Sequence, residues 1–168
     1  MQSQLSFFVS IAFSFIAWGI VTARYIWSEL RLRQRADALR PLLMLHSFRF
    51  IGLAFLVPGV VSPDLPSAFA QSAAYGDIIA AILAVLALIS LQCGWRCHRM
   101  DLQPLGAADL LNAFYQANRA GLLPGQLGAT YFIPTFVVPL LLITHGLAFR
   151  ILLQRENVPP AQERRRLA

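Results

Sequence analysis

The stretch AAYGDIIAAILAVLALISLQ, residues Ala73–Gln92, carries a single charged side chain, Asp77. An α-helix needs about 20 mostly apolar residues to cross the hydrocarbon core of a bilayer, and this run has that length. Three more runs of similar length and polarity lie elsewhere in the chain: Leu5–Trp27, Leu42–Val61 and Tyr131–Leu153. The sequence therefore predicts an all-α fold, a polytopic bundle of transmembrane helices.

The composition of the whole chain agrees with this prediction. Of its 168 residues, 57% are hydrophobic and 13% are charged, whereas soluble domains carry about 25% charged residues. The mean hydropathy is +0.59. These values exclude a soluble globular enzyme, a disordered chain and a fibrous repeat.

The basic residues are all arginines, and most of them stand at the ends of the apolar runs. There are 14 of them and the formal net charge is +6. Arginines beside apolar runs are typical of the cytoplasmic face of a membrane protein, so we expect no binding of nucleic acid. Rich in arginine, alanine and leucine and devoid of lysine, the composition suits the inner membrane of a bacterium with a GC-rich genome.

The connections between the runs predict the orientation of the chain. Ser28–Pro41, Trp95–Arg99 and the tail 154–168 are rich in arginine, so the positive-inside rule places them in the cytoplasm. Ser62–Ser72 contains Asp64 and no basic residue, and is expected in the periplasm. We therefore expect a periplasmic N-terminus and a cytoplasmic C-terminus.

This orientation requires one more crossing. Segments on both sides of Tyr131–Leu153 are expected in the cytoplasm, so Leu105–Leu123 should also span; as a helix it is about 28 Å long. The prediction is a bundle of five helices over residues 1–153, followed by a basic cytoplasmic tail at 154–168. The alternative is four spans plus one interfacial amphipathic helix, with the tail outside.

Polar residues in Leu105–Leu123 follow a helical spacing. Asp109, Asn112, Gln116 and Arg119 fall at i, i+3, i+7 and i+10, which is one stripe of a helix. If the segment spans, the stripe must face the bundle interior and would line a ligand-binding cavity, because charged side chains facing lipid are unfavourable. If the segment lies flat, the stripe is a solvated face.

Ionisable residues within the other runs are candidate functional residues. His46 and Arg49 lie one turn apart on one face, and His145 lies in the last run. With five crossings the two histidines share the cytoplasmic half and can form a joint site; with four they lie in opposite halves. Asp77 is a candidate for proton transfer, but its position near the outer end of its run predicts that it lies too far away to join them.

Three functional interpretations fit these residues. Arg49 could hold an anionic ligand with the histidines as proton donors or acceptors; His46 and His145 could ligate haem b; or the histidines and Asp77 could pass protons. The structural alternative is that the histidines hydrogen-bond between helices while Arg49 pairs with a carbonyl or with Asp109.

We therefore expect a membrane protein that binds or conducts a small molecule, ion or lipid through a polar interior. One alternative is a haem-binding redox subunit. Another is a structural or assembly subunit of a larger membrane complex, or a homo-oligomer. The chain has no hydrolase, metalloprotease, P-loop or dinucleotide-binding motif, so no enzyme is expected. Its expected partners are the lipid bilayer and a small or anionic ligand, with no metal and no cofactor other than the haem of the alternative.

One pattern also resembles a known group of proteins. Arg49–Leu56 (RFIGLAFL), Leu65–Ala70 (LPSAFA) and Gly76-Asp77 are similar to a pattern in small uncharacterised bacterial multi-pass inner-membrane proteins. The resemblance implies that Arg49, the Leu-Pro turn and Gly-Asp form one local unit at the outer side of the second and third helices. It implies no activity.

Overall fold

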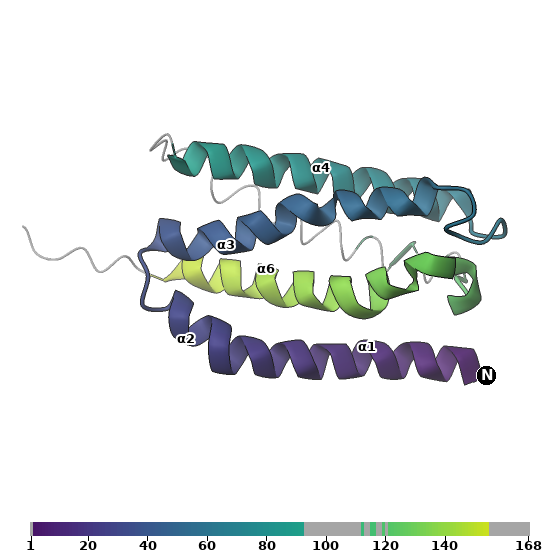
Figure 1. Cartoon of the computed structure of the whole chain (residues 1–168), viewed down its shortest axis with the longest axis horizontal. Coiled ribbons are helices and arrows are strands. Elements are labelled where there is room, and N and C mark those ends of the chain that lie inside the picture. The colour runs from purple at the N-terminus through teal and green to yellow at the C-terminus, as the bar shows by residue number, and fades with distance from the viewer. Residues whose placement is uncertain (1, 93–111, 113–114, 117–118, 120, 155–168) are drawn as a thin grey trace, which may run out of the picture.

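The computed structural model describes residues 2–92, 112, 115–116, 119 and 121–154. Within these ranges every named element of secondary structure is a helix. Four helical rods are long and apolar enough to cross a membrane: Gln2–Leu30, Arg35–Leu56, Ser67–Leu91 and Ile133–Leu153. Figure 1 shows them lying lengthwise beside one another. The all-helical prediction is confirmed for the described chain, and each of the four apolar runs corresponds to one rod.

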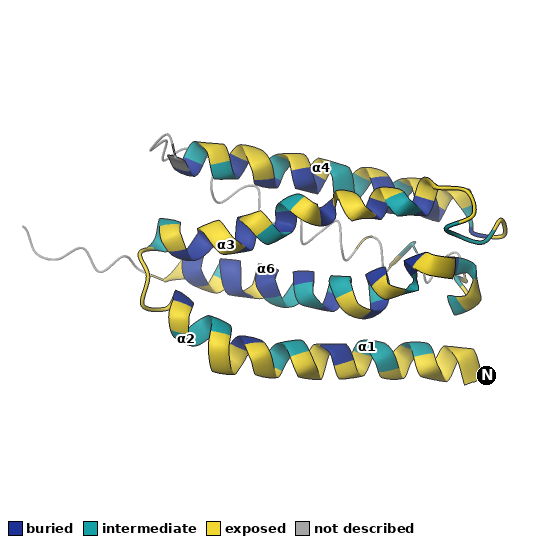
Figure 2. Ribbon diagram, in the orientation of Figure 1, coloured by how far each residue is buried: buried dark blue, intermediate teal, exposed yellow. Residues whose placement is uncertain are grey.

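The first rod lies at the edge of the bundle. It consists of α1 (Gln2–Val21), a π-helical turn η1 (Thr22–Ile26) and α2 (Trp27–Leu30). Its helices contact α6 (Val138–Leu153) and the turn before it. Figure 2 shows that most of α1 is exposed, and its large exposed side chains are apolar. An apolar surface of this kind suits contact with lipid tails.

The second rod changes its winding half-way. It begins as α3 (Arg35–Ser47) and continues as the 3₁₀-helix η2 (Phe48–Leu56). A 3₁₀-helix has three residues per turn, so side chains at i and i+3 lie one above the other. The buried residues of η2 follow this period: Arg49, Gly52 and Phe55. The winding therefore keeps one stripe of η2 pointed at its neighbours.

The third rod packs through small residues. It is α4 (Ser67–Gln92), which begins earlier than the predicted Ala73 because Pro66 starts it: the amide of Ala70 donates to the Pro66 carbonyl at 3.0 Å. Small side chains let helix backbones approach closely. The buried positions of α4 are mostly alanines: Ala70, Ala73, Ala74, Ala80, Ala81, Ala84 and Ala87.

A 3₁₀-helix, η3 (Pro124–Tyr131), precedes the fourth rod, which begins with a π-helical turn, η4 (Ile133–Val137), and continues as α6. Backbone bonds join η3 to the connection before α4: the amide of Ser62 donates to the Gln126 carbonyl at 3.1 Å, and the amide of Ala129 donates to the Val60 carbonyl at 2.8 Å. Two segments far apart in sequence thus close one end of the bundle together.

Apolar packing closes the opposite end. One cluster joins the end of α6 to α2 and to the start of α3: Leu30, Ala38, Leu39, Leu42, Leu147, Ala148, Ile151 and Leu152. A second cluster joins Ala87 and Leu91 near the end of α4 to Leu43. The last residues of α4 therefore lie at this end of the bundle and η3 lies at the other (Figure 1). Most of the predicted fifth crossing, Leu105–Leu123, lies outside the described residues.

Gly128 is the position where the two connections meet most closely. Its φ is +53°, and a Cβ atom there would lie 2.5 Å from the Val60 carbonyl oxygen. We predict that Gly128→Ala lowers the free energy of unfolding by about 1–3 kcal/mol through backbone strain and this overlap. Gly125→Ala, where a Cβ meets nothing within 4 Å, is the control. Unfolding in mixed micelles, followed by circular dichroism, measures both; equal effects of the two substitutions would contradict the prediction.

Candidate functional site

A buried ion pair joins the second and third rods. The Arg49 guanidinium donates to Asp77 Oδ1 from Nε at 2.8 Å and lies 2.6 Å from the same oxygen through Nη2. The side chains of Arg49 and Asp77 are 1% and 13% exposed. Charge-assisted contacts of this length are among the stronger hydrogen bonds in proteins. The pair therefore fixes the register between η2 and α4.

Gly52 makes room for the carboxylate. It lies one 3₁₀ turn after Arg49 on the buried stripe of η2. A Cβ atom added to Gly52 would overlap Asp77 Oδ2 and crowd the rest of that side chain. Any larger residue would therefore displace the carboxylate from the position in which it meets the guanidinium.

The contact of Asp77 with Arg49 adds to what the sequence indicated for this residue. Asp77 was expected too close to the outer end of its run to join a site with the histidines. Its carboxylate binds Arg49, one turn of helix from His46. Because α4 begins at Ser67 and not at Ala73, Asp77 lies deeper in its helix than expected; that it lies too far from the histidines to join them stays a prediction. Arg49 pairs with Asp77, which agrees with the one local unit that the resemblance implied for Arg49 and Gly76-Asp77; the candidate partner Asp109 lies outside the described residues.

The two histidines lie together, in the joint site that the five-crossing arrangement allows. The ring centroids of His46 on α3 and His145 on α6 are 4.0 Å apart, with the ring planes inclined by 39°. Both residues are buried, at 4% and 5% exposure. The pair bridges the second and fourth rods near the middle of their length.

Thr144 orients the His46 ring. Its Oγ1 lies 3.3 Å from His46 Nε2, and it also lies 2.9 Å from the Leu140 carbonyl and 3.0 Å from that of Leu141. A hydroxyl has one proton, and here the nearby backbone carbonyls of its own helix accept it. The oxygen then accepts from His46 Nε2–H. This assignment makes Nδ1 the unprotonated nitrogen, and Nδ1 has no hydrogen-bond partner among the described residues.

The contact between the rings bears on haem binding. A haem iron held by two histidines lies between their ring nitrogens, with the porphyrin plane separating the rings. His46 and His145 touch each other directly, so this packing leaves no space between them for a porphyrin. The described residues also contain no group of three histidine, cysteine or carboxylate side chains arranged to hold a metal ion.

The polar stripe predicted in Leu105–Leu123 is described only in part. Asn112 and Arg119 are exposed, and Gln116 is half-buried. The Arg119 guanidinium lies 5.8 Å from the centre of the Tyr115 ring. The structure therefore does not bring Asn112 or Arg119 into contact with the histidines, and Asp109 lies outside the described residues.

Together these residues form what we call the buried polar cluster: His46, Arg49, Asp77, Thr144 and His145. Sequence reasoning identified four of them. It missed Thr144, and it missed that Gly52 leaves the space which the Asp77 carboxylate occupies. The signals for both are present in the sequence. Thr144 directly precedes His145, and Gly52 follows Arg49 at the spacing of one turn.

Comparison with known proteins places this cluster within a recognised domain. Residues 6–153 match DUF8737, described as a domain of unknown function. The chain belongs to this family. No curated protein and no solved structure matches the chain. The DUF8737 match includes most of the first rod and the other three rods entirely, and ends with α6, so every residue of the buried polar cluster is part of the domain.

The ion pair yields a stability prediction. Asp77→Asn leaves the Arg49 charge buried without a counter-charge, so we expect it to lower the free energy of unfolding by about 3–5 kcal/mol. The double variant Arg49→Met/Asp77→Leu removes both charges and should recover most of that loss. Unfolding in mixed micelles measures both. A double variant no more stable than Asp77→Asn would contradict this account of the pair.

Proposed function

We propose that this DUF8737 protein is an integral membrane protein with five crossings that passes protons through the buried polar cluster. The observation that carries the proposal is the direct contact of two buried histidine rings beside a buried ion pair. Histidine free in water is the side chain whose proton exchange falls in the physiological pH range. Ionisable groups inside a membrane-spanning bundle are energetically costly, so they often mark functional sites. Proton relays are a common example of such sites.

The order of the groups along the bundle supports a relay. His46 and Arg49 are separated by about 4.5 Å of helix rise. The histidine pair lies toward the arginine-rich end, and the Arg49–Asp77 pair lies one turn closer to the end formed by η3. The Asp77 side chain keeps 13% exposure. Titratable side chains on three rods, His46, His145 and Asp77, thus belong to one polar cluster, in which the permanently charged Arg49 is paired with Asp77.

The charges at the two ends support the proposed orientation. The connection 57–66 at one end contains Asp64 and no arginine, whereas near the other end lie six arginines, Arg24, Arg31, Arg33, Arg35, Arg40 and Arg150, against the two carboxylates Glu29 and Asp37. The positive-inside rule assigns the arginine-rich end to the cytoplasm, and the bacterial inner membrane is the location we propose. Because α4 ends where α6 also ends, a further crossing between them, by Leu105–Leu123, completes the path of the chain.

The orientation is tested by reporters fused after Ala168. With five crossings and a periplasmic N-terminus, we expect a green fluorescent protein fusion to fluoresce and an alkaline phosphatase fusion to be inactive, because both reporters stay in the cytoplasm. The same two reporters placed within 62–64 serve as the control and should give the reverse pattern. An active phosphatase after Ala168 would contradict the fifth crossing.

Proton passage is tested in liposomes that contain a pH-sensitive dye. With a potassium gradient and valinomycin as the driving force, we expect vesicles with the wild-type protein to change internal pH faster than protein-free vesicles. His46→Phe and His145→Phe keep an aromatic ring in the same space but cannot carry a proton, so both should fall to the protein-free rate.

Ser47→Ala is the matched control, because it changes the residue next to His46 while removing only a local bond to the Met44 carbonyl. It should conduct like the wild type. Circular dichroism and size-exclusion chromatography verify that each variant is folded. The proposal is wrong if the wild type equals protein-free vesicles, or if folded histidine variants conduct like the wild type.

A further inference from the structure

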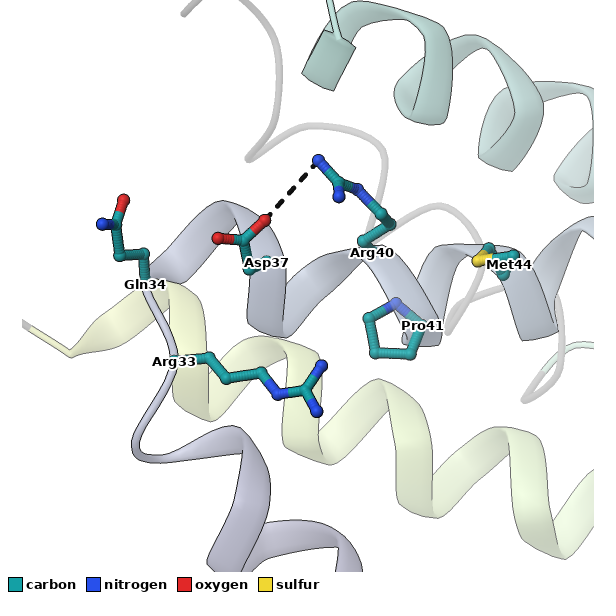
Figure 3. Close-up of a pocket in the computed structure, with 6 residues that line it drawn as sticks. All are labelled: Arg33, Gln34, Asp37, Arg40, Pro41 and Met44. Atoms are coloured by element: carbon teal, nitrogen blue, oxygen red, sulfur yellow. Dashed lines mark ion pairs between the residues drawn. The ribbon is translucent and has the colours of Figure 1, made fainter.

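A second polar feature lies at the arginine-rich end, away from the buried polar cluster. It is an open hollow of about 440 Å³ where the connection after α2 enters α3 (Figure 3). The hollow has the size of a small-ligand site. Six side chains line it: Arg33, Gln34, Asp37, Arg40, Pro41 and Met44.

The lining of the hollow changes from charged to apolar along α3. Four of the lining side chains lie on one face of α3, because Asp37, Arg40 and Met44 recur at the spacing i, i+3, i+7 and Pro41 lies at i+4. Figure 3 shows Met44 further along α3 than the charged side chains. Met44 is 53% exposed and lies within the rod that is apolar enough to cross a membrane. The hollow therefore extends from the charged end of the bundle toward the apolar middle of the bundle.

The charged part of the lining is positive. Arg33 and Arg40 oppose a single carboxylate, that of Asp37. Arg40 Nη2 and Asp37 Oδ1 lie 3.5 Å apart, and both side chains are about half exposed, so this pair is weak and leaves most of the Arg40 donors available. Arg33 makes no ion pair with any other residue that the structure describes. The net charge of these three side chains is therefore +1, which matches the single negative charge of one phosphodiester group.

We propose that this hollow binds the phosphate group of an anionic phospholipid. Arg33 and Arg40 donate to the phosphate oxygens, for which the planar guanidinium is well suited, and the lipid chain follows Pro41 and Met44. Basic pockets at the cytoplasmic side of transmembrane helices recognise anionic headgroups in this way. A soluble phosphate would use the arginines but would gain nothing from the apolar part of the lining. The proposal requires this end of the bundle to lie at headgroup level and does not depend on proton passage.

The test compares two double variants that lose the same charge from the same end. Arg33→Gln/Arg40→Gln removes the arginines of the hollow, whereas Arg24→Gln/Arg31→Gln removes two exposed arginines that do not line it. Each protein is reconstituted in nanodiscs of equal parts phosphatidylcholine and phosphatidylglycerol. Native mass spectrometry then counts the lipids that stay bound after transfer to detergent.

We expect the wild type and Arg24→Gln/Arg31→Gln to retain phosphatidylglycerol over phosphatidylcholine. In Arg33→Gln/Arg40→Gln this preference should fall by about tenfold or more, as expected for two arginine contacts. An equal fall in both double variants would reveal diffuse attraction by the positive end and would overturn the site. Equal retention of the two lipids by the wild type would also overturn it.

A further variant and a further probe separate a lipid from a soluble anion. Met44→Glu leaves both arginines but places a carboxylate in the apolar part of the hollow, so it should also lose retained phosphatidylglycerol. Unchanged retention would overturn the lipid assignment. Inorganic phosphate, added to the detergent-solubilised wild type, should not raise its melting temperature. Stabilisation by phosphate without retention of phosphatidylglycerol would assign the hollow to a soluble anion and overturn the proposal.

Discussion

The buried pairing of Arg49 with Asp77 is the constraint on which the rest of the bundle depends. An arginine that is 2% exposed within an apolar bundle is tolerable only if its charge is met by a partner. That requirement fixes the register of η2 against α4, because a shift of one helix by one turn would separate the two side chains by about 5 Å. The glycine at position 52 and the alanine face of α4 follow from it, since both let the two backbones come close enough for the pair to form.

The 3₁₀ winding of η2 extends this constraint to a third rod. Because the buried residues recur every three positions, the stripe that holds Arg49 and Gly52 continues back to His46 at the end of α3. His46 in turn meets Thr144 and His145 on α6. The polar layer thus connects the second, third and fourth rods. The first rod stands outside this layer and is held by its packing along α6, which agrees with its largely exposed surface.

The sequence predicts the rods well and their ends poorly. Apolar length identifies all four, because the bilayer sets that length whatever the packing. The starts at Arg35 and Ser67 are hidden, because residues 35–41 and 67–72 are too polar to join the apolar runs although they are helical. The sequence analysis allowed a meeting of His46 with His145 only in the five-crossing arrangement, which was inferred from the placement of the arginines and stays a prediction. The pairing of Arg49 with Asp77 does not follow from depth counted from Ala73, and only the resemblance put these two residues in one local unit; a change from α to 3₁₀ winding leaves no clear mark in the sequence.

The two ends of the bundle are closed by different forces, and this difference bears on how the middle can work. Backbone hydrogen bonds and the close contact at Gly128 hold η3 to the connection before α4. Apolar packing, the Arg150 guanidinium 4.0 Å from the centre of the Trp27 ring, and a bond from Arg35 to the Gln154 carbonyl hold the other end. Helices restrained at both ends do not easily separate around a bulky substrate. The proposed passage of protons needs no such opening, so it is compatible with the way the two ends are held.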